Sequence, residues 1–267
     1  MEQKSRERKY KQQFSCISEK EPIVREREQR KERKQLVKIG IIGAMEVEVA
    51  RLVQSMTGAK EVTKAGMHFY DGKIGGTDAV VVRCGIGKVN AGLCVQILCD
   101  LFDVTHLINT GIAGSLEEEI NIGDVVVSID AMYHDMDVTG VGYEAGQVPQ
   151  MDVLAFPADA QLRVAAVKAC REAAPEIGVY EGRVASGDQF ICDKAKKAWI
   201  KEMSGALCTE MEGAAIAHAA YINGVPYVIV RAISDKADES VKLAYEIFEA
   251  EAAKHCAAIV EHMVRSF

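Results

Sequence analysis

The feature that most constrains the fold of this chain is a repeated alternation of short apolar runs with longer helical patterns. From Lys38 onward, runs rich in Val and Ile end in short turns, most of which contain glycine. Such runs are typical of strands buried on both faces of a sheet. Segments with apolar residues at helical spacing separate most of them. Because strands alternate with helices, we predict an α/β fold with a largely buried sheet.

The predicted elements can be given by residue number. Strands are expected within 37–44, 104–114, 123–129, 178–188 and 226–234, with a hairpin of two further strands within 68–87. Helices are expected within 45–56, 88–102, 159–173, 193–203, 212–223 and 239–264. The glycines near residue 114 are expected to form a loop, and a long polar loop is expected over 133–150.

The first 37 residues differ from the rest of the chain. They contain 12 Lys/Arg and 7 Asp/Glu with few apolar residues, which predicts a disordered extension before a domain over 38–267. A solvated helix or a basic arm that binds an anionic partner are alternatives. The remainder carries a net charge of −12. This acidic body argues against a nucleic-acid partner, because phosphate binding needs a basic surface.

Acidic side chains occur in apolar surroundings near the C-terminus. The stretch 208–235 is mostly Ala, Val and Ile, yet it contains Glu210, Glu212 and Asp235. Burial of an unpaired carboxylate is strongly unfavourable, so acids in a core segment need partners or a function.

Polar side chains also follow the ends of the predicted strands. They are Glu46, Glu48, Asn109, Asp188 and Asp235. In sheets of this class, ligands bind beyond the carboxyl ends of the strands. We therefore expect the acids at these exits to line one pocket.

Each acid also has a structural explanation. Glu46 and Glu48 begin a helix, where carboxylates interact favourably with the helix dipole, and considered alone they are better explained as capping residues. Either Glu210 or Glu212 can cap the helix that follows, and Asp235 can cap the segment after its strand. The grouping of these acids at strand exits is what favours a functional interpretation.

Other kinds of site find little support in the sequence. The strings GIGKVNAG and NTGIAG match neither a P-loop nor a dinucleotide-binding motif, so tight turns explain their glycines by default. His134, Asp135 and Asp137 lack the spacing of a known metal site, and loop packing explains them better. The eight cysteines form no CxxC pair, and no apolar run is long enough to span a membrane. We expect no metal, no cofactor, no membrane partner and a cytoplasmic location.

Seven strings, in order, resemble the 5′-methylthioadenosine/S-adenosylhomocysteine nucleosidases of the purine nucleoside phosphorylase-like family. They are KIGIIGAMEVEV, CGIGK, INTGIAG, YHDMDVTGVGYEAGQVP, SGDQFI, TEMEGAAIAH and VRAISD. The resemblance covers residues 38–267, and the first 37 residues have no counterpart in it. It implies a single-domain, three-layer fold with a central mixed sheet flanked by helices, and a homodimer without a cofactor.

The resemblance also implies a reaction, the hydrolysis of the N-glycosidic bond of adenine thionucleosides. A small-molecule adenine nucleoside would be converted to adenine and a 5-thioribose derivative, as in methionine salvage. Glu48 would be the general base that activates water, Arg231 would orient Glu48 and the water, and Asp235 would protonate N7 of the adenine.

Further residues are implied at the substrate site. They are Glu212 and Met211 at the ribose, Phe190 and Ile191 at the adenine, Met45 and Ile86 around the ribose and thioalkyl group, and Ala113, Gly114 and Ser234. Val141, Tyr143 and Pro149 would complete the site of the partner subunit.

Two positions depart from the family pattern, and alternatives of the same fold remain. Ile112 stands where Ser is common, and Val141 stands where Phe is common. A purine nucleoside phosphorylase is one alternative, with Arg83 and Lys88 as its only nearby candidates for binding phosphate. Hydrolases of aminodeoxyfutalosine or AMP are a second alternative, and a nucleoside-binding protein without catalysis is a third.

Overall fold

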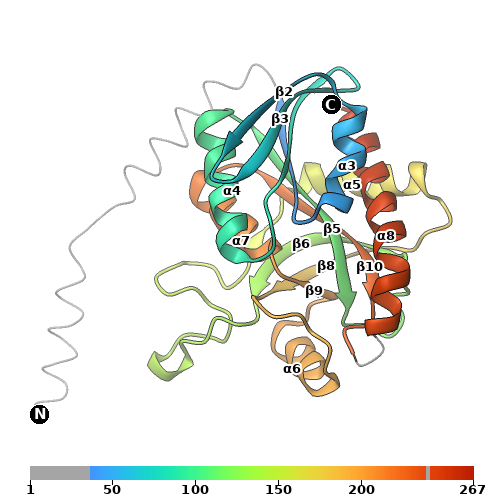
Figure 1. The fold of residues 1–267 in the computed structure, drawn as a ribbon. Helices are drawn as coiled ribbons and strands as arrows, with labels where there is room; N and C mark the ends of the chain where they lie inside the picture. The colour runs from blue at the N-terminus through green and yellow to red at the C-terminus, as the bar shows by residue number, and fades with distance from the viewer. Residues whose placement is uncertain (1–36, 239–240) are drawn as a thin grey trace, which may run out of the picture. The chain divides into compact units, whose positions relative to one another are not determined.

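The structure of the chain is a computed structural model that describes residues 37–238 and 241–267 (Figure 1). The expectation of a disordered extension concerns residues that lie, except for Val37, outside the described part. The helices are α3 (Glu46–Ser55), α4 (Lys88–Leu101), α5 (Ala160–Ala173), α6 (Lys194–Ser204), α7 (Gly213–Asn223) and α8 (Val241–Val264), with a short 3₁₀ helix, η1 (Thr139–Val141). None of these described helices is long and apolar enough to cross a membrane.

The strands form one mixed sheet. They are β1 (Lys38–Gly43), β2 (Thr57–Lys64), β3 (Met67–Ile74), β4 (Thr77–Arg83), β5 (His106–Ser115), β6 (Val125–Tyr133), β7 (Phe156–Pro157), β8 (Val179–Ser186), β9 (Cys208–Glu210) and β10 (Tyr227–Asp235). From one edge inward the order is β2, β3, β4, β1 and β5. Beyond β5, the strands β10, β6, β8 and β9 follow in turn, and β9 pairs with β5 again. The sheet is therefore open on one side of β5 and closed into a ring on the other.

Strand β5 changes neighbours along one of its edges. Residues 106–109 pair with β1 in parallel, whereas Gly114 and Ser115 pair with β9 in antiparallel. Strand β10 pairs along the opposite edge. Between the two pairings, residues 110–113 have no described strand beside them on the first edge. The backbone groups in this gap need other hydrogen-bond partners. The carboxylate of Glu48 is one such partner, because it accepts a hydrogen bond from the N–H of Ile112.

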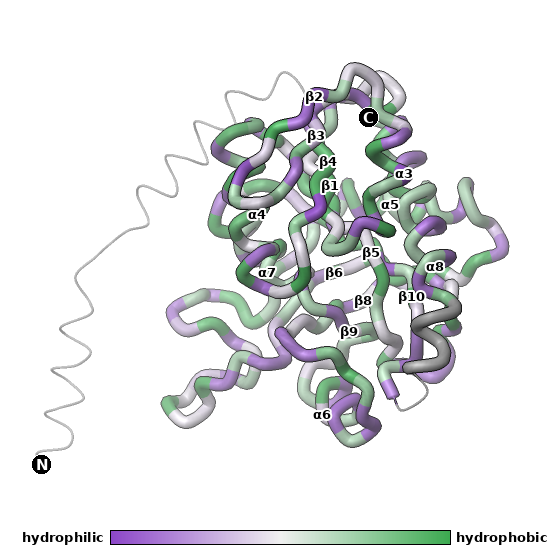
Figure 2. The backbone as a smooth tube through the Cα atoms, in the orientation of Figure 1, coloured by the Kyte–Doolittle hydropathy of each residue, from purple (hydrophilic) through white to green (hydrophobic). Residues whose placement is uncertain are grey.

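Helices cover the sheet on both faces. Helices α3, α5 and α8 contribute Leu52, Cys170 and Val260 to one apolar cluster against the central strands. Helices α4 and α7 contribute Leu98 and Ile216 to a second cluster. Figure 1 shows these two groups of helices on opposite sides of the sheet, and Figure 2 shows that hydrophobic residues run along the central strands between them. The predicted three-layer α/β fold is confirmed.

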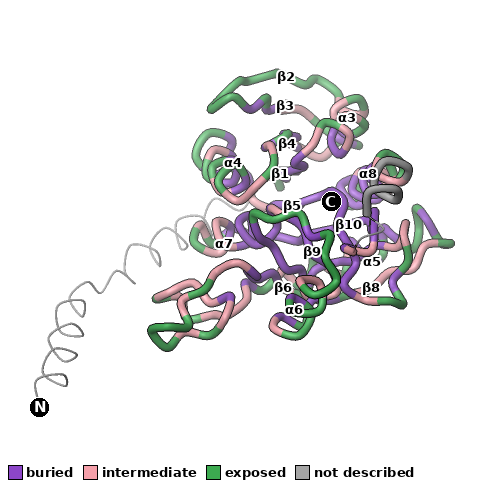
Figure 3. Tube along the Cα trace, turned by 60° about the horizontal axis from the view of Figure 1, so that its bottom comes forward, coloured by how far each residue is buried: buried purple, intermediate pink, exposed green. Residues whose placement is uncertain are grey.

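Most predicted elements are present, and the differences have physical reasons. Strand β5 continues through its glycines to Ser115, where a loop was expected, because β9 and β10 both pair with its end. Strands β2, β7 and β9 were not predicted. Every residue of β2 is exposed, as Figure 3 shows, so its sequence carries no apolar alternation. Strands β7 and β9 have two and three residues, too few to form a pattern.

Candidate active site

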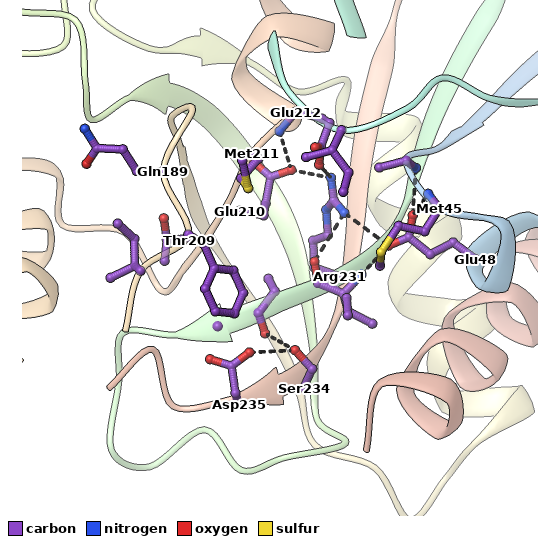
Figure 4. A pocket seen from close by; sticks show the side chains of 17 residues that line it. Met45, Glu48, Gln189, Thr209, Glu210, Met211, Glu212, Arg231, Ser234 and Asp235 are labelled. Atoms are coloured by element: carbon purple, nitrogen blue, oxygen red, sulfur yellow. Dashed lines mark hydrogen bonds and ion pairs between the residues drawn. The ribbon is translucent and has the colours of Figure 1, made fainter. Parts of the chain in front are cut away.

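A pocket opens at the gap in the edge of β5 (Figure 4). Its walls come from β5, β9 and β10 and from the segments that follow β1, β4, β8 and β9. The lining residues are Ala44, Met45, Glu48, Ile86, Ile112, Ala113, Gly114, Gln189, Phe190, Ile191, Thr209, Glu210, Met211, Glu212, Arg231, Ser234 and Asp235. Most of them lie at or after the carboxyl ends of strands, as the sequence predicts.

The side chain of Arg231 lies in the middle of the acidic part of this pocket and is only 1% exposed. Its Nη2 donates to Oδ1 of Asn109 at 2.7 Å and to the carboxylate of Glu210. The same nitrogen lies 3.5 Å from Oε2 of Glu212. Its Nη1 lies 3.9 Å from Oε1 of Glu48. One guanidinium thus interacts with three buried glutamates, and a buried charge needs such partners.

Glu48 is held at the beginning of α3 by backbone donors. Its Oε2 accepts hydrogen bonds from the N–H groups of Ala44 at 2.7 Å and Met45 at 2.9 Å. Its Oε1 accepts a hydrogen bond from the N–H of Ile112 at 3.1 Å, so the carboxylate occupies the gap beside β5. Burial raises the pKa of the Glu48 carboxyl, and the Arg231 guanidinium partly opposes this.

Glu210 stabilises the start of α7. It accepts hydrogen bonds from the hydroxyl of Ser186, from the N–H of Glu212 at 3.1 Å and from the N–H of Gly213 at 2.8 Å. These bonds satisfy N–H groups at the helix N-terminus, which otherwise have no partner within the helix. The capping explanation therefore holds for Glu210, which also pairs with Arg231.

Glu212 is oriented by a different loop. Its Oε1 accepts a hydrogen bond from the N–H of Gly87, just before α4, at 2.9 Å. Burial, together with the nearby Glu210 carboxylate, raises the pKa of Glu212 to about 7. The group can therefore accept or donate a hydrogen bond near neutral pH.

Asp235 lies at the other side of the pocket, at the end of β10. Its Oδ2 accepts a hydrogen bond from the hydroxyl of Ser234 at 2.8 Å, and its Oδ1 accepts one from the N–H of Ala237 at 2.7 Å. Burial raises the pKa of the Asp235 carboxyl, and the Ser234 hydrogen bond partly opposes this. Figure 4 shows Asp235 and Glu48 on different sides of the pocket, each directed toward its interior.

The structure brings together all the residues that the family resemblance implies at the site of one subunit. The predicted catalytic acids, Arg231 and every predicted substrate-binding residue line the pocket. Glu46 and Asp188 were also expected in the pocket because they follow strand ends. Neither of them lines it, so that expectation was wrong. Glu46 points away from the pocket with its side chain 70% exposed, and Asp188 binds the N–H of Lys88. Asn109 lies behind Arg231 rather than on the pocket surface.

The remaining candidates lie elsewhere. Asp135, in the loop after β6, pairs with Lys88 at 2.6 Å, while His134 is buried and Asp137 binds Thr139. Val141 is 74% exposed and does not line the pocket of its own chain.

Sequence reasoning missed several lining residues. Gln189 and Thr209 adjoin predicted residues but carry no pattern of their own. Gly111, which does not line the pocket, was also missed as a residue that shapes the site. An added Cβ atom there would lie 2.3 Å from both Nη1 of Arg231 and Oε1 of Glu48. The absence of a side chain at this position is what allows the two charged groups to approach each other across β5.

Comparisons with known proteins show the family of this chain. The family model of the Phosphorylase superfamily matches residues 38–265 of this chain. The chain is 43% identical over 225 residues to the 5′-methylthioadenosine/S-adenosylhomocysteine nucleosidase of Shewanella denitrificans, covering 84% of this chain and 97% of that protein. It is similar to the crystal structure of the nucleosidase of the same name from Neisseria meningitidis in complex with methylthio-immucillin-A, with a TM-score of 0.84, 36% identity, and coverage of 87% and 100%. It is also similar to a futalosine hydrolase of Helicobacter pylori, with a TM-score of 0.82, 30% identity, and coverage of 87% and 99%.

The close packing at Gly111 gives a first prediction. Gly111→Ala should lower the free energy of unfolding by about 1–3 kcal/mol, because the added methyl group forces Arg231 and Glu48 apart. Gly92→Ala is the matched control, since a Cβ atom there meets nothing within 4 Å. Its effect should be neutral or stabilising by roughly 0.5–1 kcal/mol, as for Gly to Ala within a helix. Urea denaturation measures both, and equal stability of the two variants would contradict the packing argument.

The raised pKa of Glu212 gives a second prediction. Between its ordinary value of 4.5 and its folded value of about 7, the folded state binds more protons than the unfolded state. The free energy of unfolding should therefore fall as the pH rises through this window. When the pH is raised from 5 to 8, the free energy of unfolding of Glu212→Gln, measured by urea denaturation, should fall by less than that of the wild type. The exposed Glu176→Gln should keep the wild-type slope, and a wild-type slope in Glu212→Gln would disprove the assignment.

Proposed function

The chain belongs to the 5′-methylthioadenosine/S-adenosylhomocysteine nucleosidases of the phosphorylase superfamily, and from this premise we propose how its pocket residues act. The enzyme hydrolyses the N-glycosidic bond of 5′-methylthioadenosine and S-adenosylhomocysteine, and it releases adenine and a 5-thioribose derivative. The observation that carries the proposal is the placement of two buried carboxyl groups, Glu48 and Asp235, on different sides of one pocket.

The chemistry of the bond requires two such groups. Cleavage of the bond between the anomeric carbon and the adenine develops positive charge on the sugar and negative charge on the base. A carboxylate near the sugar stabilises the first charge, and an acid near the base removes the second, as in other glycoside hydrolases. Protonation of the adenine turns it into a neutral leaving group.

Asp235 is the proposed general acid. A general acid must hold a proton when it acts, and burial raises the pKa of this carboxyl in the required direction. In our proposal the adenine lies between Phe190 and the end of β10, with its N7 at the Asp235 carboxyl. Ser234 donates a hydrogen bond that fixes the orientation of the carboxyl.

Glu48 is the proposed general base. It must be ionised to accept a proton from water, and the Arg231 guanidinium favours its ionised form against the effect of burial. The three backbone donors on its oxygens hold the carboxylate in one orientation. In our proposal the attacking water lies between Glu48 and the anomeric carbon, on the face opposite the base.

Glu212 is the proposed ribose ligand. Its carboxyl group faces the pocket between the positions assigned to the water and the base, and Gly87 fixes one of its oxygens. Carboxylates commonly hold sugar hydroxyls, and these bonds strengthen as positive charge develops on the ring. Met211 would pack against the same face of the sugar.

A phosphorylase reaction is disfavoured by the charges around the pocket. The ammonium group of Lys88 is occupied, because it lies 2.6 Å from Asp135 and 3.8 Å from Asp188. Arg83 does not line the pocket. Phosphate would approach Glu48 and Glu212, and like charges in a buried site repel each other. Water is the acceptor that this electrostatic environment favours.

We further propose that the enzyme acts as a cytoplasmic homodimer. Helices α4 and α7 expose apolar side chains on the side away from the sheet, among them Val89 (73% exposed), Leu93 (49%) and Ile222 (47%). Exposed apolar residues that cluster in this way are typical of subunit interfaces. Val141 and Pro149, in the loop after β6, are the residues proposed to complete the partner's pocket. The described cysteines are free thiols, which suits a reducing compartment.

Asp235→Asn tests the proposed general acid. The amide keeps the shape of the side chain but cannot transfer the proton, so kcat should fall by about 10²–10⁴-fold while the dissociation constant for adenine changes little. Adenine release and calorimetric titration measure the two quantities. Asp78→Asn, at the surface in an ion pair with Lys73, is the control and should keep the wild-type kcat. A wild-type kcat in Asp235→Asn would reject the assignment.

Val89→Glu tests the proposed dimer. A charge on the apolar face of α4 should raise the dimer dissociation constant at least about 100-fold, because the charge loses its hydration in the interface. Val164→Glu is the matched control, since Val164 on α5 is exposed to a similar extent (70%) but lies on another helix layer. Analytical ultracentrifugation over a concentration series measures both. A wild-type protein that sediments as a monomer, or a Val89→Glu variant as dimeric as its control, would contradict the proposal.

A further inference from the structure

A second cavity opens beside the pocket and shares part of its wall. It has a volume of about 510 Å³ and lies between the beginning of α3, the turn before β3 and the segment after β4. Ala44, Met45 and Ile86 line both the pocket and this cavity. The two cavities are therefore neighbours that share an apolar part of their walls.

The shared wall lies at the Glu48 side of the pocket, away from Asp235. Figure 4 shows Met45 next to Glu48, with Asp235 on the far side of Arg231. If the base occupies the Asp235 side and the ribose the middle, the sugar substituent that reaches the second cavity is the one at the 5′ position. For the substrates of this enzyme, that substituent is the thioether chain.

The walls of the second cavity are partly apolar and partly polar, and they include a pair of opposite charges. Met67 and Cys84 are almost fully buried in its wall and suit a thioether chain. Arg83, at the end of β4, and Glu46, in the first turn of α3, supply the charges. Their side chains are 50% and 70% exposed, and Nε of Arg83 lies 3.8 Å from Oε2 of Glu46.

We propose that this cavity binds the amino-acid end of S-adenosylhomocysteine, with Arg83 holding its carboxylate and Glu46 its ammonium group. The proposal rests on the function proposed above and extends it to the part of the substrate that 5′-methylthioadenosine lacks. Arg83 and Glu46 are then determinants of specificity rather than of catalysis.

The opposite charges of Arg83 and Glu46 favour a zwitterionic ligand over other possible occupants of the second cavity. A guanidinium presents paired donors that match a carboxylate, and a carboxylate is the natural partner of an ammonium group. A phosphate group, as in AMP, would meet Glu46 as well as Arg83 and gain little from the pair. An exposed ion pair at this distance contributes little to the free energy of folding. Arg83 and Glu46 can therefore separate and bind the charged groups of a ligand with only a small loss of stability.

The test compares kcat/KM for S-adenosylhomocysteine with kcat/KM for 5′-methylthioadenosine, both measured by adenine release from the full chain. In Arg83→Met, the ratio of the first value to the second should fall about tenfold, the size of effect expected for one charge-assisted hydrogen bond at a partly exposed site. Arg83→Lys should restore part of the ratio, because it keeps the charge. Glu46→Gln should also lower the ratio. Arg51→Met, which removes a half-exposed arginine that pairs with Glu261 far along the chain, should leave the ratio at the wild-type value.

The outcomes separate this inference from the proposed function. A wild-type ratio in both Arg83→Met and Glu46→Gln would overturn the inference while leaving the function intact. A higher ratio in Glu46→Gln would also overturn it, because the cavity would then bind a simple anion and not a zwitterion. Failure of the wild-type enzyme to release adenine from either substrate would instead contradict the proposed function.

Discussion

The ionic contacts of Arg231 with three glutamates are the interaction on which the rest of the site depends. Glu48, Glu210 and Glu212 come from separate parts of the chain, and a buried cation is what allows their carboxyl groups to lie so close together. One positive charge does not neutralise three negative ones, so protons remain in the site near neutral pH, and the raised pKa of Glu212 is one sign of this. The same imbalance disfavours an anionic co-substrate and favours the neutral water molecule.

The fold provides the place for this cluster by leaving one strand edge incomplete. Between its pairings with β1 and β9, β5 turns backbone groups toward Glu48 rather than toward another strand. Arg231 reaches the same point from β10 and donates to the carbonyl of Ile112 at 3.2 Å. The proposed catalytic groups are therefore held by contacts with the sheet, which gives the precise placement that proton transfer requires.

The sequence predicts the alternation of strands and helices and the strand exits well, because Val- and Ile-rich runs that end in turns are separated by longer helical segments. The three layers follow from the family resemblance. The sequence also places Glu48 and Asp235 in one pocket, since the carboxyl ends of the parallel strands β1, β5 and β10 meet at one edge of the sheet. Position along the chain does not tell which way a side chain points, and for this reason Glu46, two residues before Glu48 on the same helix turn, was wrongly expected in the pocket. Gly111 matters through its close approach to Glu48 and Arg231, and Glu210 pairs with Arg231 in addition to its local capping role. No local pattern records these contacts between distant parts of the chain.

The central claim is that water and purine are held on opposite sides of the anomeric carbon, by Glu48 and Asp235 respectively. A crystal structure of the full chain with an unreactive adenine nucleoside analogue measures this directly. The account predicts a hydrogen bond between a ring nitrogen of the base and the Asp235 carboxyl. It also predicts an ordered water within hydrogen-bonding distance of Glu48, on the other face of the sugar. A base bound beside Glu48, or an Asp235 carboxyl that contacts only solvent, would contradict it.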